Sequence, residues 1–208
     1  MVIKGKYQTV NGWVNLNKPR ALSSFQAVSR VRRAFSASKA GHAGTLDPLA
    51  TGVLPIALGE ATKTTIYAMD GIKTYHFGIC WGEGRTTDDR EGSITAISEN
   101  RPSKSDICTA TKAFEGVIEQ IPPRFSAIKV DGRRAYELAR KNQEVQLKAR
   151  NVEIEDFKLI DLEGPDHASF SVTCGKGTYV RSLARDLAHS LGTFGYVDWL
   201  RRTAVGPF

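Results

Sequence analysis

The stretch Gly-His-Ala-Gly-Thr-Leu-Asp-Pro-Leu-Ala-Thr-Gly-Val-Leu-Pro, residues 41–55, sets one carboxylate in an uncharged segment. Asp47 is the only formally charged residue from Gly41 to Gly59. Apolar neighbours such as Leu46 and Leu49 exclude water, which raises the pKa of a carboxylic acid toward the neutral form. Leu-Asp-Pro is also an ordinary turn sequence, and from local chemistry a turn residue is the simpler interpretation. A chemical role for Asp47 requires a cation from elsewhere to hold it ionised.

One candidate cation is Arg181, in the first turn of a helix expected between Gly177 and Gly192. Gly192 supplies the stop of this helix. The helix is predicted by apolar residues at helical spacing, namely Val180, Leu183, Ala184, Leu187 and Leu191. Its dipole disfavours a cation in the first turn by up to about 1 kcal/mol. Arg181 is therefore expected either to reach water or to pair with an anion, for which Asp47 and a phosphate are the candidates.

The remaining chain alternates between strand-like and helix-like segments. Strands are expected over residues 12–16, 72–81, 93–98, 145–162 and 167–174. Helices are expected over residues 23–35, after Gly59, and over 104–114 and 134–141. The first helix should have a capping box from Ser23 to Gln26. Its expected buried stripe is Phe25, Val28, Val31 and Phe35. One face of the 72–81 strand should bury Tyr75, Phe77, Ile79 and Trp81. This pattern favours an α+β fold with a largely antiparallel sheet.

Composition narrows the class of protein. The 208 residues are 41% hydrophobic and 25% charged, as in ordinary globular proteins. The longest apolar run, residues 53–58, is far shorter than the roughly 20 residues of a membrane-spanning helix. The first residues contain no apolar signal-peptide core, so we expect a cytoplasmic protein. The three cysteines and four histidines are scattered, which predicts reduced thiols and no metal site. Asp88, Asp89 and Glu91 could bind a divalent cation, but a polar turn is the simpler interpretation.

The net charge of +7 and pI near 9.4 suit a polyanionic partner, although a basic surface alone does not identify one. Basic residues cluster between Arg30 and Lys39 and between Lys129 and Lys141. Residues 121–130 interleave aromatic, proline and basic side chains, as a flap that grips RNA would. A hairpin at a sheet edge is the alternative.

Taken together, the motifs closely resemble the bacterial TruB family of tRNA pseudouridine synthases. They are Asn17-Lys18-Pro19, the stretch 39–54, Gly59-Glu60-Ala61-Thr62-Lys63, Pro122-Pro123-Arg124-Phe125-Ser126-Ala127, Gly177-Thr178-Tyr179-Val180-Arg181-Ser182-Leu183 and Leu200-Arg201-Arg202-Thr203. The resemblance implies a pseudouridine synthase fold, with a mixed, mostly antiparallel sheet, flanking helices and an RNA-gripping thumb segment at about residues 124–145. It also implies a single catalytic domain, 1–208, that converts the T-loop uridine at tRNA position 55 to pseudouridine without metal or cofactor.

The resemblance also assigns roles to residues. Asp47 matches the catalytic nucleophile, Arg181 the arginine that pairs with it, and Tyr75 the tyrosine that stacks on the flipped base. His42 matches the residue that enters the T-loop where that base has left. The other RNA-binding positions implied are Lys18, Lys63, Tyr179 and Leu200. The partner expected is the T-loop and T-stem of tRNA, with no membrane, no obligatory protein partner and a monomeric enzyme.

Three departures from the family pattern qualify these expectations. Asn17 and Ala21 stand where the family usually has aspartate and glycine. Thr86 replaces a usual aspartate, and the chain ends before the usual small C-terminal RNA-binding domain, which is therefore expected to be absent or truncated. The alternative function is a tRNA-binding and folding module with weak or lost catalysis.

Overall fold

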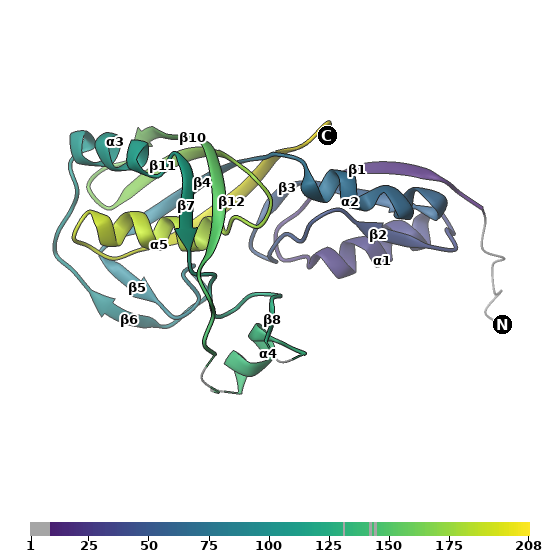
Figure 1. The fold of residues 1–208 in the computed structure, drawn as a ribbon, viewed down its shortest axis with the longest axis horizontal. Coiled ribbons are helices and arrows are strands. Elements are labelled where there is room, and N and C mark those ends of the chain that lie inside the picture. Colours follow the sequence, from purple (N-terminus) through teal and green to yellow (C-terminus); the bar gives the residue numbers. More distant parts are fainter. Residues whose placement is uncertain (1–8, 131, 142, 144) are drawn as a thin grey trace. The chain divides into compact units, whose positions relative to one another are not determined.

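A computed structural model describes residues 9–130, 132–141, 143 and 145–208 (Figure 1). These residues form two compact units. The first comprises the described residues up to 76 together with 200–208, and the second comprises residues 77–199. Strands β4 (Lys73–Trp81) and β12 (Gly195–Val205) contribute residues to both units.

The first unit is built around β3 (Thr51–Leu58). β1 (Gly12–Lys18) runs antiparallel along one edge of β3 from end to end. The other edge is shared by β2 (Ala40–His42), antiparallel, and by the last part of β12, parallel. Gly52 permits this parallel contact, because a Cβ at its position would lie 2.0 Å from the Arg202 carbonyl oxygen. The segment carrying Asp47 thus connects two strands paired to each other.

Helix α1 (Ser24–Ala34) begins at the predicted capping box: Ser23 accepts a hydrogen bond from the Gln26 N–H, and the Gln26 side chain accepts one from the Ser23 N–H. Of the predicted buried stripe, Val31 is buried and Val28 is half-buried, whereas Phe25 is 80% exposed and Phe35 is 46% exposed, so the prediction is wrong for both aromatic residues. The buried face is instead Ser24, Ala27 and Val31. Small residues and a hydroxyl face inward here because Ser24 is hydrogen-bonded to the backbone of Leu46. As predicted, helix follows Gly59, as η1 (Gly59–Thr64) and α2 (Thr65–Asp70).

In the second unit the strand order is β12, β4, β11 (His167–Cys174), β10 (Arg150–Leu162) and β7 (Gly116–Gln120). β10 is antiparallel to both of its neighbours. Aromatic rings from β4, β11 and β10 meet in the core of the second unit. The ring centroid of Phe77 lies 5.5 Å from that of Phe170 and 6.1 Å from that of Phe157. Phe77, Ile79 and Trp81 are buried as predicted, whereas Tyr75 is half-buried. The mixed, mostly antiparallel α+β fold is confirmed.

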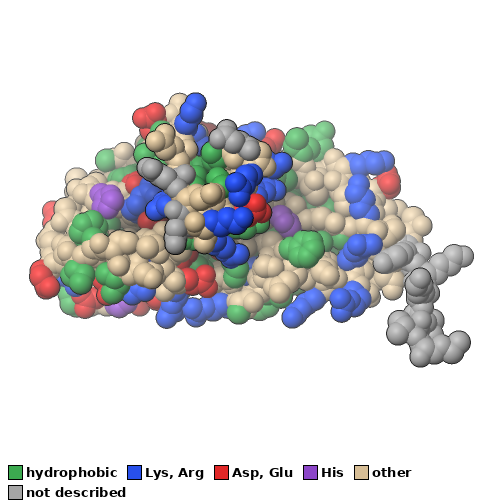
Figure 2. Space-filling view, turned by 90° about the horizontal axis from the view of Figure 1, so that it is seen from below, with side chains coloured by type: hydrophobic (Ala, Val, Ile, Leu, Met, Phe, Trp, Pro, Cys, Tyr) green, Lys and Arg blue, Asp and Glu red, His purple; other side chains and the backbone are tan. Residues whose placement is uncertain are grey.

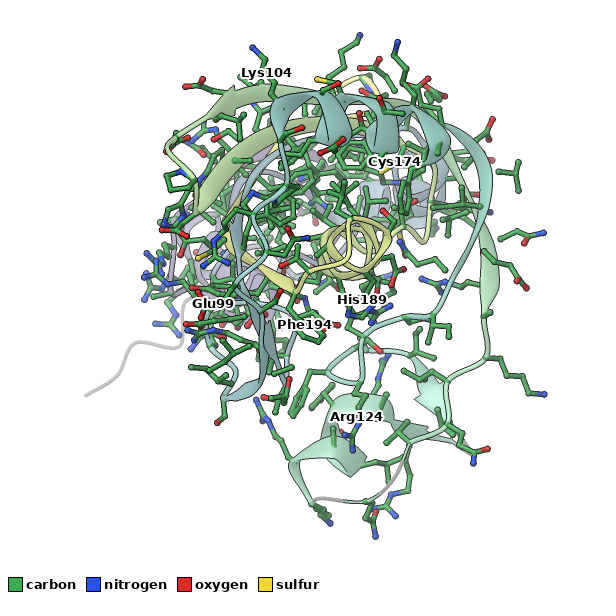
Figure 3. All side chains as sticks on the ribbon, turned by 90° about the vertical axis from the view of Figure 1, so that its left-hand side faces the viewer. Glu99, Lys104, Arg124, Cys174, His189 and Phe194 are labelled. Carbon is green, nitrogen blue, oxygen red and sulfur yellow. The ribbon has the colours of Figure 1, made fainter. Side chains whose placement is uncertain are left out.

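Helices α3 (Lys104–Ala113) and α5 (Val180–Ser190) complete this unit, and Figure 3 looks along α5 with α3 above it. The inward face of α5 buries Leu183, Ala184 and Leu187, as the periodicity predicts. A hairpin of β5 (Glu83–Arg85) and β6 (Ile94–Ile97) precedes α3. None of the helices in the described part of the chain is long and apolar enough to cross a membrane.

The described part of the thumb segment, residues 124–145, folds as a small hairpin and helix. β8 (Lys129–Val130) pairs with β9 (Arg133–Arg134), and α4 (Ala135–Arg140) follows at once. In Figures 1 and 3 these elements project from the sheet and α5 of the second unit, with the labelled Arg124 among them. Figure 2 shows Lys and Arg side chains gathered on the face seen from below. The exposed basic residues of the segment itself are Arg124, Lys129, Arg133, Arg134, Arg140 and Lys141.

Candidate functional site

Asp47 lies in a tight turn between β2 and β3, as its sequence predicts. Its carbonyl oxygen accepts a hydrogen bond from the Ala50 N–H at 3.0 Å, with Pro48 at the second position of the turn. The preceding residue is fixed to α1: the Ser24 hydroxyl donates to the Leu46 carbonyl and accepts from the Leu46 N–H, both at 2.8 Å. A buried hydroxyl with two such bonds holds the backbone rigidly. The half-buried Asp47 side chain therefore stands on a loop of defined geometry.

Lys18 lies fully buried at the end of β1 beneath this loop. Its ammonium donates to the carbonyls of Leu22 (2.7 Å), Pro19 (3.0 Å) and Pro48 (3.4 Å). Burial lowers the pKa of Lys18, the charge of Asp47 raises it, and the charge of Arg202 lowers it. Lys18 and Asp47 thus act on each other electrostatically, and the bonds of Lys18 make it a brace of the Asp47 turn.

Arg202 is a second buried cation in the same unit, and it is 1% exposed. Its Nε donates to the Val53 carbonyl at 2.8 Å, and one terminal nitrogen donates to the Gly44 carbonyl at 3.1 Å. Sequence reasoning used Arg202 only as part of the Leu-Arg-Arg-Thr motif and assigned it no role. The signal was weak, because the neighbouring Arg201 has the same chemistry and is exposed.

His42 ends β2, two residues before Gly44. It is half-buried, and its Nδ1 is buried without a hydrogen-bond partner among the described residues. Burial, and after it the charge of Arg202, lowers the pKa of His42 below its usual 6.5. The imidazole is therefore neutral at physiological pH.

Four more of the predicted site residues differ in their settings. Tyr75, on β4, is half-buried in the same unit as Asp47, and Leu200, on β12, is 7% exposed. Lys63, on η1, is exposed and forms an ion pair with Glu60, a type of contact that stabilises little. Tyr179 lies in the second unit as the N-cap residue of α5, and the guanidinium of Arg150 stands 5.0 Å from the centre of its ring.

Arg181 is buried in the second unit and only 5% exposed, so the exposed alternative is wrong. It donates to the carbonyls of Thr87 and Phe125, each at 3.0 Å, and its Nη1 lies 3.7 Å from Asp89 Oδ2. Both side chains of this ion pair are 6% exposed. Because Asp47 belongs to the other unit, its pairing with Arg181 stays a prediction.

Asp89 is a functional candidate that the sequence offered as a turn residue, with a cation ligand as the alternative, and not as a partner of Arg181. Its Oδ1 accepts hydrogen bonds from the Thr87 hydroxyl (2.5 Å) and the Glu91 N–H (3.0 Å). The next pair along α5 repeats the arrangement, since Arg185 Nη1 lies 3.0 Å from Asp88 Oδ2. Burial raises the pKa of Asp88, and the charges of Arg185 and Arg181 oppose this. The described residues contain no group of side chains suited to a metal ion, and these two aspartates bind arginines.

Comparison with known proteins identifies the family. Residues 32–180 match the TruB family pseudouridylate synthase (N terminal domain). The chain belongs to this family. It is 55% identical over 205 residues to the tRNA pseudouridine synthase B of Bartonella bacilliformis. The matched region covers 99% of this chain and 64% of that protein. It is 57% identical over 208 residues to the same-named protein of Caulobacter vibrioides, covering 100% of this chain and 67% of that protein. The chain thus spans about two thirds of the length of its curated TruB relatives.

Solved structures share the TruB fold. A Cbf5-Nop10-Gar1 complex matches with a TM-score of 0.72 and 30% identity, over 95% of this chain and 49% of that one. An H/ACA RNP bound to a substrate RNA containing 2'-deoxyuridine matches with a TM-score of 0.70 and 27% identity, over 95% of this chain and 48% of that one. The pseudouridine synthase fold expected from the sequence is confirmed.

Proposed function

We propose that this chain is the catalytic domain, 1–208, of a tRNA pseudouridine synthase that isomerises the T-loop uridine at position 55. The observation that carries the proposal is a half-buried Asp47 on a turn braced by Ser24 and Lys18, in a chain of the TruB family. The relatives named tRNA pseudouridine synthase B supply the substrate class.

In the proposed mechanism Asp47 is the nucleophile, attacking either the uracil ring or the ribose. The bond from C1' to N1 breaks, the base rotates, and a bond from C1' to C5 forms. The bond that Asp47 made to the nucleotide is broken again, which regenerates the carboxylate. The proton at C5 is lost and N1 gains one, so no oxidant, reductant or cofactor is consumed. A carboxylate must be ionised to act in this way. The charge of Asp47 raises the pKa of Lys18, so the two groups interact electrostatically in the loop that carries the nucleophile.

The other site residues are proposed to manage the flipped base. Extrusion of a base costs a few kcal/mol of unstacking, which protein contacts must offset. His42 would occupy the gap in the T-loop, Tyr75 would stack on the target base, and Arg181 would pair with Asp47. Lys18, Lys63, Tyr179, Leu200 and the thumb segment would support or contact the RNA. We propose a monomeric, cytoplasmic enzyme that needs no protein partner.

The test is to incubate the protein with an unmodified tRNA transcript and to map pseudouridine by nucleotide position. The proposal predicts modification of the T-loop uridine and of no other uridine in the transcript. A transcript whose T-loop uridine is replaced by cytidine is the matched control and should gain no pseudouridine. Folded protein that binds the transcript but leaves the T-loop uridine unchanged under single-turnover conditions would contradict the proposal.

That last outcome would favour the second candidate, a tRNA-binding and folding module. The observation behind it is Thr86, which stands where the family usually has an aspartate. Thr86 is exposed, and its hydroxyl accepts a hydrogen bond from the Ser93 N–H at 3.1 Å. It therefore stabilises the turn between β5 and β6 without supplying a negative charge.

A further inference from the structure

We propose that Arg202 is a positioning residue of the site: its buried guanidinium ties the loop between β2 and β3, which follows His42 and carries Asp47, to β3, and it holds a positive charge against the backbone two residues after His42. The RNA-binding consequence of this inference rests on the proposed function, whereas the protonation state of His42 does not.

The guanidinium of Arg202 contacts the chain on both sides of Asp47. It donates to the Gly44 carbonyl, three residues before Asp47, and to the Val53 carbonyl on β3. Gly44 has a φ of 100°, and a Cβ there would lie 3.4 Å from Arg202 Nη1. The backbone of β12 also lies close to β3, because a Cβ at Gly52 would collide with the Arg202 carbonyl. Arg202 thus fixes the loop that carries both His42 and Asp47.

The charge of Arg202 is not cancelled by a direct ion pair. Among the residues that the structure describes, its hydrogen-bond partners are backbone carbonyls, and no carboxylate lies within ion-pair distance. A buried charge without a contacting counter-ion is weakly screened and acts over several ångströms. It lowers the pKa of both Lys18 and His42.

The elements that contact β2 carry other charged residues, so the effect of Arg202 must be distinguished from theirs. β3 contributes no charged residue. The charged groups on the other elements and loops near β2 are Lys18, Arg30, Arg32, Arg33, Lys39, Asp47, Glu60, Lys63 and Arg202. Of these, Arg202 is the one whose charge lowers the pKa of His42, in addition to burial. His42 Nδ1 has no hydrogen-bond partner among the described residues, so no acceptor there stabilises the protonated imidazole.

A neutral His42 changes how the site meets RNA. A protonated imidazole would be drawn to phosphates, whereas a neutral ring can enter a stack of bases without losing the hydration of a charge. As the pH falls from about 8 to about 6, protonation of His42 should then add less to the affinity for RNA than it would for a histidine that titrates at its usual value. Basic residues elsewhere on the chain would supply the attraction to the backbone.

The test is an NMR titration of the His42 imidazole, assigned by comparison with His42→Gln. The wild-type protein should titrate below the usual value of about 6.5. Arg202→Gln removes the charge but keeps an amide donor for the carbonyls, and it should raise the pKa of His42. Arg202→Lys keeps the charge and should keep the pKa low. Arg201→Gln removes an exposed arginine one residue away and should leave the pKa unchanged.

A wild-type His42 that titrates at or above 6.5 would overturn the proposal even if Arg202→Gln failed to fold. An unchanged pKa in a folded Arg202→Gln protein would also overturn it. In RNA binding, Arg202→Gln should gain more affinity than the wild type as the pH falls from about 8 to about 6. A chain that bound no tRNA would contradict the proposed function while leaving the titration result valid.

Discussion

Ala21 has a backbone conformation that most residues avoid. Its φ is 62°, in the left-handed region, and its N–H donates to the Pro48 carbonyl at 2.8 Å. That bond connects the segment after Lys18 to the turn of Asp47. A residue with a Cβ in this region costs about 1–2 kcal/mol, which glycine avoids. The glycine that the family usually has at this position is thus explained by backbone geometry at the site.

We expect Ala21→Gly to stabilise the protein by about 0.5–1 kcal/mol, because relief of strain exceeds the entropy lost by glycine on folding. Urea denaturation measures the change. Ala34→Gly, at an exposed helical position, is the matched control and should destabilise by about 0.5–1 kcal/mol. If both variants lost the same amount of unfolding free energy, residue 21 would not be strained.

Individual site residues could be predicted only where the sequence isolates them. Asp47 stands out because its segment has no other charge, and Arg181 because it opposes a helix dipole. Ser24, Asp89 and Arg202 were missed because their importance lies in partners 22, 92 and 158 residues away along the chain. Nothing in the local pattern distinguishes a buried Arg202 from the exposed Arg201. The outward turn of Phe25 had the same cause, since the hydrogen bonds of Ser24 decide which face of α1 is buried.

At the scale of elements, two ion pairs fix the start of α5 against the turn that follows β5. Arg181 and Arg185 lie one helical turn apart. Arg181 forms an ion pair with Asp89, and Arg185 forms one with the preceding residue, Asp88. Gln120 adds a contact from β7, because its side chain accepts from the Tyr179 N–H at 2.8 Å and donates to the Tyr179 carbonyl at 3.2 Å. Helix α5 therefore presents Arg181 in one orientation despite its unfavourable dipole.

We expect Asp89→Asn to lower the free energy of unfolding by about 3 kcal/mol, because it removes the negative charge of a buried carboxylate that lies 3.7 Å from Arg181 Nη1. Chemical denaturation tests this. The control is Asp198→Asn, whose partner Arg90 is 43% exposed, and it should cost less than about 1 kcal/mol. Similar losses of unfolding free energy in both variants would mean that the buried Arg181–Asp89 pair stabilises the protein no more than the exposed pair does.

The elements recovered from the sequence are those with a clear period. α3, α5, β4 and β11 match their predicted spans to within three residues at each end. β3 was not predicted, because residues 51–58 are almost continuously apolar and contain Gly52 and Pro55, so neither a strand nor a helix period is visible. β12 was missed because charged residues interrupt its apolar pattern. Its parallel pairing with β3 joins segments far apart in the sequence, so no local signal indicates it.

At the scale of the whole molecule, the net charge and the family are both consistent with the proposed RNA substrate. A net charge of +7 and the exposed basic residues of the thumb segment fit an RNA substrate, and membership of the TruB family is the basis on which we propose a uridine isomerase. The architecture could be predicted as α+β from alternating strands and helices, but the strand order could not. It follows from pairings between segments far apart in sequence, such as β4 with β11.

The central claim is that Asp47 performs chemistry and does not merely shape a turn. The most direct measurement is single-turnover formation of pseudouridine on a T-arm stem-loop by wild-type protein and by Asp47→Asn, with the Kd of each for the same RNA. We predict that Asp47→Asn lowers the rate by more than about a thousandfold while the Kd is largely unchanged. Asparagine keeps the shape of the side chain and leaves the carbonyl bond to Ala50 intact. A folded Asp47→Asn protein with near wild-type rate would contradict the account.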